Sequence, residues 1–479
     1  MAKLLLLFFG GLGTFFFLLL HPAGAAIFVF AITPFDSILW NLFGHAGNLV
    51  TVLPLLIFLM RPTPGGWIGA FLGTRVQRAT ALLMGVMVVP HLLVVSVYGL
   101  GTMLVYLQKV ALFLLLGVMA SGLRDPRHAK LCGQGLVLSM AAFGLLSMAD
   151  FYLGLQLLPV GTGDWGAGGL VAGADEYTRA NDYRLVGLGG LEPNQFGLAL
   201  VMALGLAGGW VLHSETRGFL GRPLALAAGA ILSMTLIATI SRSGIGGAGV
   251  GLAVVLVLVF RVQPGRLVLL AAVTFIVFQG AWFLIGTIGL GGAVEERFST
   301  EAVSAMGNVR VVRWIHGLRL FADAPLFGVG YGQLGTPNVP ALSAGSDPHN
   351  AYVRQLAWGG IVGFLAWAYW YFVVLTTLLR RPVGLGDGVA RWQPFYLAAF
   401  LGMSFCNIFV SQMYVRYMFM PAAFAVVLER ARSAHRVAAA RDRLEAASAA
   451  PGGWTPPDPP VRDGAPPSGL AGSARRAGH

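Results

Sequence analysis

Apolar runs of roughly 20 residues recur along this chain from its N-terminus to about residue 428. Folded as helices, runs of this length match the hydrocarbon thickness of a bilayer. Because a chain inside lipid must satisfy its backbone hydrogen bonds internally, runs this long and apolar are helices. The pattern therefore predicts an all-α polytopic membrane protein. The predicted spans are 4–20, 24–43, 46–60, 80–98, 102–121, 129–150, 196–212, 223–240, 245–260, 267–289, 351–378, 393–411 and 414–428.

The number of spans depends on the stretch before Arg61. Lys3 favours a cytoplasmic N-terminus, which requires an even number of spans in that stretch and about 12 overall. Three separate spans there would give about 13 and would place the N-terminus on the other side. The first run precedes Ala23-Gly24-Ala25, which is similar to a signal-peptide cleavage site. More apolar sequence follows at once, so we expect a retained membrane helix, with a cleaved signal peptide as the alternative.

The arginines of the short loops predict the orientation. Alternate loops are basic, and the positive-inside rule places such loops in the cytoplasm. The opposite side then holds the long segments 151–195 and 290–350 and the short turn 241–244. Long segments without strong periodicity are usually functional or disordered. Each of these two long segments ends in a motif directly before a predicted helix, which favours function. The basic loops contain Arg61, Arg75 and Arg78; Arg124, Arg127 and Lys130; Arg217 and Arg222; Arg261 and Arg266; and Arg380, Arg381 and Arg391.

Composition supports the membrane class and excludes others. Of 479 residues, 56% are hydrophobic and 11% are charged, whereas soluble domains carry roughly a quarter charged residues. The net charge of +12 could indicate nucleic acid, but the basic residues lie in short loops and the tail and no nucleic-acid motif accompanies them, so we expect no such partner. Cys132 and Cys406 lie in apolar segments without disulfide or zinc spacing, and we expect small core residues.

The chain divides into a membrane domain and a tail. Residues 1–428 hold the spans, the first extracytoplasmic loop and the large extracytoplasmic loop. From residue 429 the sequence is basic and Ala-rich, compatible with a short juxtamembrane helix that ends near Ala450. The remainder to His479 is rich in Pro, Gly, Ala and Ser, which predicts a disordered cytoplasmic tail.

Two loops each offer an arginine beside small or polar residues. Arg184 precedes a glycine-rich stretch that ends in Glu192-Pro193-Asn194, and Arg242 follows Ser241 between two apolar runs. A guanidinium can donate bidentate hydrogen bonds to a phosphate. A cation at the membrane border is costly unless it is hydrated or paired, so an anionic partner is a reasonable expectation. Each arginine could instead be solvated or reach lipid headgroups.

The large loop contains a candidate surface helix. Residues 308–321 fit an amphipathic helix that lies on the membrane face. The alternative is a surface helix whose arginines simply face water. The glycines that follow it suit a tight, irregular turn. The helix would bring Arg310, Arg313 and His316 near one another, with Trp314, Leu318 and Phe321 on its apolar side and Gly328, Gly330 and Gly332 in the turn.

His349 closes the large loop. Asp347 and Pro348 predict a helix start, with the helix running from about Asn350. A neutral imidazole at that position could accept a proton from an attacking hydroxyl, although a histidine there could also hydrogen-bond only locally. Three separated loops with arginines and one histidine predict a site for an anionic, diphosphate-like lipid. No carboxylate pair, metal-ligand cluster or Asp-x-Asp motif is evident, so we expect a reaction without metal or cofactor, on a donor activated by its own leaving group.

Four ordered elements between about residues 180 and 410 resemble the bacterial O-antigen ligase and O-antigen polymerase superfamily. Each element is weak alone, but their order and their shared placement on the outer face make the resemblance specific. They are Arg184 with Glu192-Pro193-Asn194; Thr239-x-Ser241-Arg242; Arg310-x-x-x-Trp314 followed by Pro325-Leu326-Phe327-Gly328-Val329-Gly330 and Gly332; and His349-Asn350-x-Tyr352 followed by Gly359-Gly360 and Gly363.

The resemblance implies a membrane glycosyltransferase. Such proteins take a glycan from a polyprenyl-diphosphate donor at the periplasmic face of the bacterial inner membrane and pass it to lipid A–core or to another glycan. By this resemblance His349 is the general base, and the donor diphosphate is held by Arg184, Arg242 and Arg310. The supporting residues it implies are Asn194, Ser241, Arg313, Asn350 and Tyr352.

Three functions remain open at this point. Ligases and polymerases share these motifs and this topology, and we prefer a ligase because the family signature is commonly organised around that activity. A lipid-linked glycan transporter is the alternative from another class. A transporter would need polar residues along a path through several helices, whereas the candidate arginines here concentrate at one face.

Overall fold

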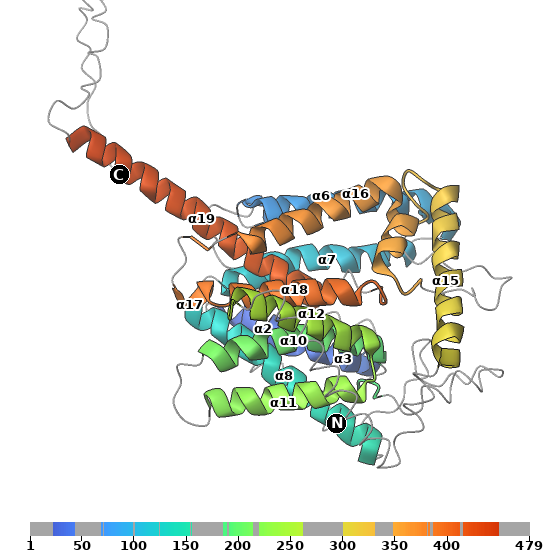
Figure 1. Ribbon diagram of the computed structural model, residues 1–479. Helices are drawn as coiled ribbons and strands as arrows, with labels where there is room; N and C mark the ends of the chain where they lie inside the picture. The colour runs from blue at the N-terminus through green and yellow to red at the C-terminus, as the bar shows by residue number, and fades with distance from the viewer. Residues whose placement is uncertain are drawn as a thin grey trace, which may run out of the picture. The chain divides into compact units, whose positions relative to one another are not determined.

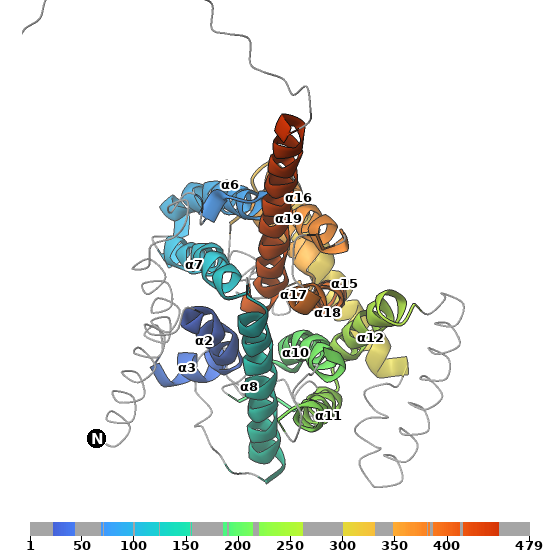
Figure 2. The same cartoon turned by 90° about the vertical axis from the view of Figure 1, so that its left-hand side faces the viewer.

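The computed structural model describes residues 23–43, 69, 71–98, 101–123, 125–153, 155, 185–188, 191–213, 220–261, 300–330, 348–380, 382–383, 387–411 and 415–449. Within these ranges the regular secondary structure is helical, apart from an isolated antiparallel bridge between Gly187 and Leu191 (Figures 1 and 2). The elements are α2 (Gly24–Ile32), the 3-10 turn η1 (Thr33–Phe35), α3 (Asp36–Phe43), α6 (Arg75–Tyr98), α7 (Gly101–Gly122), α8 (Pro126–Leu153), α10 (Pro193–His213), α11 (Arg222–Ala238), α12 (Arg242–Leu258), α15 (Thr300–Asp323), α16 (Ala351–Leu379), α17 (Asp387–Ala390), α18 (Gln393–Cys406) and α19 (Arg416–Ala449).

The all-helical membrane class is confirmed. Four described helices are long and apolar enough to cross a bilayer: Arg75–Leu93, Arg127–Leu153, Pro193–His213 and Ala351–Leu379. Shorter apolar helices cover Gly24–Leu39, Val110–Ser121, Arg222–Ala238 and Arg242–Leu258. The predicted spans 4–20, 46–60 and 267–289 lie outside the described residues, so the total of about 12 spans stays a prediction.

Two predicted spans are wrong in detail. Residues 24–43 do not form one continuous helix, because η1 separates α2 from α3. Pro34 lies in this turn, and a proline has no backbone N–H to continue a helical ladder. In the predicted span 393–411, α18 already ends at Cys406, and 407–411 is irregular.

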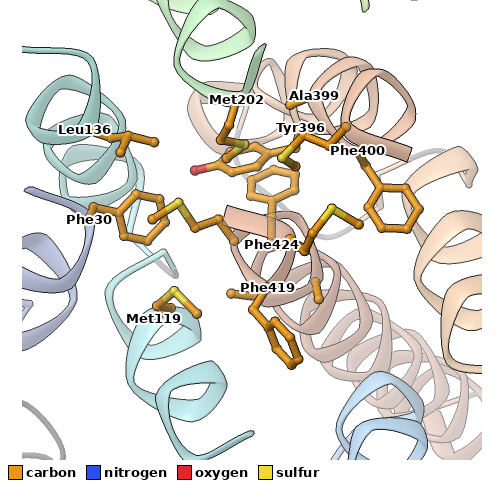
Figure 3. Close-up of a cluster of buried hydrophobic side chains, with 14 of the residues drawn as sticks. Phe30, Met119, Leu136, Met202, Tyr396, Ala399, Phe400, Phe419 and Phe424 are labelled. Carbon is orange, nitrogen blue, oxygen red and sulfur yellow. The ribbon is translucent and has the colours of Figure 1, made fainter. Parts of the chain in front are cut away.

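A dry core joins the helices in the middle of the bundle (Figure 3). Phe30 of α2, Met119 of α7 and Leu136 of α8 face aromatic rings from α18 and α19. The rings of Tyr396 and Phe424 stack with their centroids 4.3 Å apart and their planes 10° apart. Since lipid tails are as apolar as these side chains, it is close packing rather than the hydrophobic effect that holds such helices together.

Helix α12 packs closely on α18. A Cβ added at Gly247 would lie 2.4 Å from Cys406 Sγ and 2.6 Å from Gly402 O, so the two backbones leave no room for a side chain. Cys406 Sγ donates a hydrogen bond to Ser243 O (3.1 Å), and both cysteines of the chain are buried and free, as the sequence predicts. Small residues at such contacts let membrane helices approach closely, and here they fix the start of α12.

The chain forms two compact units, residues 1–432 and 433–479. All the helices up to α18 and the first half of α19 belong to the first unit. In the second unit, α19 continues to Ala449, in the stretch where a short helix is expected, and Arg441 Nε pairs with Glu445 Oε1 at 2.7 Å. The predicted disordered tail beyond this helix lies outside the described residues.

Candidate functional site at the loop end of the bundle

Helices α10, α12 and α16 all begin at one end of the bundle, which we call the loop end. Helix α15 runs crosswise to the other helices beyond this end (Figure 1). The described parts of both long segments and the turn between α11 and α12 therefore meet there, as the loop pattern predicts. The contacts that join the helix starts are Ser241 Oγ to Asn194 Oδ1 (3.2 Å), Cys406 Sγ to Ser243 O (3.1 Å) and Ala351 N to Asn407 O (2.8 Å).

Arg242 is the first residue of α12. Ser241 is the N-cap of this helix, and its Oγ accepts a hydrogen bond from Gly244 N (3.2 Å). Ile240, just before the cap, has a φ of 47°, which is costly for a β-branched residue. The tight turn between α11 and α12 thus holds the half-buried Arg242 at the loop end.

The first and second sequence motifs touch each other. Asn194, at the start of α10, accepts from Ser241 Oγ (3.2 Å) and donates from Nδ2 to Glu192 Oε1 (2.9 Å). Arg184 lies outside the described residues. The turn that follows it is anchored, because Leu188 N donates to Ser147 Oγ at 3.1 Å and Leu188 O accepts from Ser37 Oγ at 2.7 Å.

Arg310 of α15 lies close to Arg242 of α12. Burial, and next the positive charge of Arg310, lower the pKa of Arg242 from its usual value. The Arg310 guanidinium lies over the Phe409 ring, with Cζ 5.8 Å from the centroid. One helical turn further on, Arg313 Nε is buried and has no hydrogen-bond partner in the described structure. Two half-buried cations placed near each other form a local concentration of positive charge.

The amphipathic helix of the large loop is present as α15, with one difference. Trp314 and Phe321 are half-buried, but Leu318, one turn from each of them, is 45% exposed. The inner surface carries the half-buried Arg310 and Arg313 instead. The predicted division into an apolar and a basic side is therefore wrong at Leu318, because packing turns a side that includes both arginines inward.

His349 lies in a strained turn two residues before α16. Its φ of 48° is in the left-handed region, which costs a non-glycine residue on the order of 1–3 kcal/mol. Asn350 then caps α16, because its Oδ1 accepts from Tyr352 N (3.0 Å) and Val353 N (3.1 Å). The predicted helix start near Asn350 is confirmed, with Ala351 as the first helical residue. This geometry holds the His349 side chain, which is half-buried, at the loop end.

The side chains of Asn350 and Tyr352 hydrogen-bond to backbone groups of the protein. Asn350 is 8% exposed, and its side-chain oxygen serves as the helix cap. The Tyr352 hydroxyl donates to Ser404 O (2.9 Å), and its ring meets Trp367 edge-on at 5.3 Å. Both side chains therefore fix the start of α16 against α18.

Sequence reasoning missed a cationic residue and an irregular segment. Arg354 lies in the first turns of α16, stacks on Trp358 with Cζ 3.6 Å from the ring centroid, and donates to Ser411 O. The segment 407–411 also carries Phe409 beneath Arg310. A charge inside an apolar run was the available signal for Arg354, since intramembrane charges usually mark functional sites.

An ion pair was missed as well. Arg416 Nη1, in the first residue of α19, pairs with Asp36 Oδ1 of α3 at 2.5 Å. Ser37, the next residue of α3, holds the Leu188 turn described above. The pair therefore ties the start of α19 to α3 beside the loop that follows Arg184.

The fold is that of a helical membrane protein, and its candidate site holds Arg242, Arg310 and the turn of His349 at one end of the helix bundle. The family model described as O-Antigen ligase matches residues 227–368. This segment of the chain is thus an O-antigen ligase family domain, and the predicted family is confirmed. Arg242, Arg310 and His349 lie inside the matched segment, and Arg184 and Asn194 lie before it. A comparison with curated proteins gave no match.

Members of this family are membrane glycan transferases, and membership implies lipid-linked glycan substrates. The matched segment begins in α11 and ends within α16. It therefore contains every described element that carries Arg242, Arg310, Arg313 or His349. The segment 407–411, which touches two of the arginines, follows the matched segment in sequence.

Proposed function

We propose that the protein transfers a glycan from a polyprenyl-diphosphate carrier to an acceptor hydroxyl at the periplasmic face of a bacterial inner membrane. The observation that carries the proposal is the proximity of Arg242 and Arg310 at the end of the bundle where the strained turn of His349 also lies. Two half-buried guanidinium groups near each other make the local potential positive, and a bound anion would be stabilised there. A diphosphate supplies that anion, and guanidinium groups suit it because their donors match phosphate oxygens in pairs.

The reaction needs few groups from the protein. The acceptor hydroxyl attacks the anomeric carbon of the glycan, and its proton passes to the imidazole of His349. The bond between the anomeric carbon and the carrier phosphate breaks, and its electron pair leaves with the polyprenyl diphosphate. Arg184, Arg242 and Arg310 stabilise the charge that develops on this leaving group. In-line attack would invert the anomeric centre, and neither a metal nor a cofactor takes part.

The supporting residues hold the arginines and His349 in position. Ser241 and Asn194 hold the starts of α12 and α10 together at the loop end. Arg313 can turn its buried Nε toward the same anion. Asn350 and Tyr352 fix the start of α16 and thereby the turn of His349.

Two acceptors fit this site. Transfer to lipid A–core makes the protein a ligase, whereas transfer to another lipid-linked repeat makes it a polymerase. The loop-end geometry is compatible with both, because it concerns the donor diphosphate and the base. We take the ligase as the main proposal and the polymerase as its alternative.

The glycan left on the carrier distinguishes these functions. In a deletion strain of the source organism, we expect long glycans stranded on the polyprenyl carrier, because polymerisation upstream of a ligase continues. Single repeat units on the carrier would identify a polymerase. Carrier-bound glycan that stays on the cytoplasmic face would identify a transporter and contradict the transferase proposal.

Complementation with His349→Ala tests the base in the same strain. General-base catalysis contributes roughly 10²–10⁴-fold, so we expect transfer to fall to background while the protein still inserts. The matched control is His316→Ala in α15, which should restore transfer. Normal turnover by a folded His349→Ala protein would remove this residue from the mechanism.

A further inference from the structure

Helix α16 is broken within its membrane-spanning length. Gly360 has a φ of 59° and a ψ of −163°, far from helical values, so residues 351–359 and 361–379 are two successive helices. A break of this kind leaves carbonyl and N–H groups without intrahelical partners on both sides. Inside a membrane such groups cost several kcal/mol each unless other protein groups bond them.

The turn that follows α15 bonds these groups. It runs from Pro325 to Gly330, and we call its pairing with the break in α16 the splice. Carbonyls before the break accept from the turn, and N–H groups after the break donate to it. The bonds are Val329 N to Ala357 O (2.8 Å), Gly330 N to Trp358 O (3.1 Å), Ile361 N to Pro325 O (2.8 Å) and Val362 N to Leu326 O (3.2 Å).

Glycine is required on both sides of the splice. Gly328 has a φ of 70°, and a Cβ there would lie 2.4 Å from the Trp358 carbonyl carbon. A Cβ at Gly360 would lie 2.4 Å from the Leu326 carbonyl carbon and oxygen. Because these neighbours are backbone atoms, they cannot move aside as a flexible side chain can. The positive φ adds strain for any other residue.

Two further contacts hold the short helix 351–359. One joins it to α15, and the other joins it to the part of α16 that follows the break. A Cβ at Gly317 of α15 would lie 2.7 Å from Val353 Cγ1, so the two helices touch closely at this point. Gln355, fully buried, donates from Nε2 to Gly363 O (3.2 Å) on the far side of the break. The short helix therefore packs on α15 near its start, where the turn of His349 lies, and is hydrogen-bonded to the turn 325–330 at its end.

We infer that α15, the turn 325–330 and the helix 351–359 form one rigid unit, and that the splice sets the position of His349 relative to Arg310. The consequence for catalysis rests on the proposed function. Arg310 and His349 belong to this unit, and Arg242 belongs to α12, which packs on α18. Ala351 N and the Tyr352 hydroxyl bond the start of the short helix to Asn407 O and Ser404 O, so the donor site is assembled where the unit joins α18. Gly328 and Gly360 are positioning residues that touch no substrate.

A disulfide between α15 and the short helix tests the rigidity. In the full-length protein with Gly317→Cys and Val353→Cys, the new sulfur would replace Val353 Cγ1, at a distance that suits a disulfide. We expect rapid closure with a mild oxidant and the same rate of glycan transfer in the oxidised and reduced forms. Closure that stops transfer, with recovery on reduction, would mean that the two helices move against each other and would overturn the inference.

The rate of closure tests the splice without any substrate. In the same cysteine background, Gly360→Ala and Gly328→Ala should each slow disulfide formation about tenfold or more, because the strained turn can no longer hold the helices together. Gly363→Ala is the matched control, since its Cβ would meet the movable Met87 side chain at 3.0 Å. An unchanged closure rate in both splice variants would overturn the inference.

The two measurements separate this inference from the proposed function. If the protein were not a transferase, the closure rates would still report on the splice. If it is a transferase, a folded Gly360→Ala protein should lose kcat and keep the KM for the lipid-linked donor nearer its normal value, because Arg242 stays in the bundle. A loss confined to KM would place the effect in donor binding and contradict a role in positioning the base.

Discussion

The arginines at the two ends of the helix bundle have different neighbours. At the end opposite the loop end, Arg430 donates to Gly69 O (3.3 Å), and Arg432 donates to Thr377 O (3.2 Å) and Arg380 O (2.6 Å) near the C-terminus of α16. At the loop end, Arg242 has another cation nearby, and Arg310 lies over an aromatic ring.

Under the proposed function, the arginines at one end serve the fold and those at the loop end serve a ligand. Carbonyl groups at a helix C-terminus carry partial negative charge and satisfy a guanidinium within the protein. Two cations near each other repel, and a bound dianion would offset this repulsion. The same side chain therefore contributes to stability at one end and, we expect, to donor binding at the other.

The strongest test of this comparison is Arg242→Lys. A lysine keeps the charge but loses the planar fork, so we expect kcat/KM for the lipid-linked donor to fall by roughly 1.5–3 kcal/mol in transition-state terms, with unchanged thermal stability. The matched control is Arg222→Lys, at the exposed start of α11. Unchanged kinetics for Arg242→Lys would remove this residue from the diphosphate site.

The bundle that holds Arg242 can be tested through two glycines of α12. Gly247→Ala should lower stability by about 1–3 kcal/mol, because the added carbon would overlap α18. It should also reduce transfer, since α12 would move with Arg242 at its start. Gly249→Ala is the control, because a Cβ there meets nothing within 4 Å. Thermal unfolding in detergent measures the stability of the two variants. An equal loss of stability in Gly247→Ala and Gly249→Ala would contradict the close packing of α12 on α18.

A smaller effect is expected from Asn350→Ala. Loss of an N-cap costs roughly 0.5–2 kcal/mol, and here it also frees the strained turn of His349. We expect lower kcat at nearly normal donor KM, and recovery in Asn350→Asp, whose carboxylate can cap the same N–H groups. Failure of the Asp variant to recover activity would mean that the Asn350 amide has a role beyond capping.

The smallest effect should come from the opposite end. Arg432→Lys loses part of its hydrogen bonding to the end of α16, so we expect a loss of about 0.5–1.5 kcal/mol in stability and normal transfer kinetics. A clear loss of kcat in this variant, with stability unchanged, would break the distinction between the two ends.

Much of the helical layout could be predicted because lipid sets the length and polarity of a spanning helix. The runs 102–121 and 196–212 match α7 and α10 to within a few residues. The interruptions could not be predicted in the same way. Gly360 lies in an apolar run that reads as one continuous helix, and the bonds that satisfy the break come from a turn earlier in the chain.

The candidate site was predictable in part. His349 and Arg242 stood out because each is a polar residue at the border of an apolar run, and Arg310 stood out because it lies in an amphipathic stretch of the large loop. Arg354 and the segment 407–411 were missed, since their importance lies in contacts with Trp358 and with two arginines from other elements. Such contacts depend on where helices distant in sequence come together.

The sequence by itself determined the helical membrane class, the family, the order of the motifs and the start of α16 near Asn350. These are local properties, since hydropathy over one helix length and capping residues decide them. Only the tertiary structure decided that Arg242 meets Arg310, that Asn194 meets Ser241, and that the turn after α15 completes a broken helix. Those contacts depend on the packing of backbones through small residues, which no local pattern records.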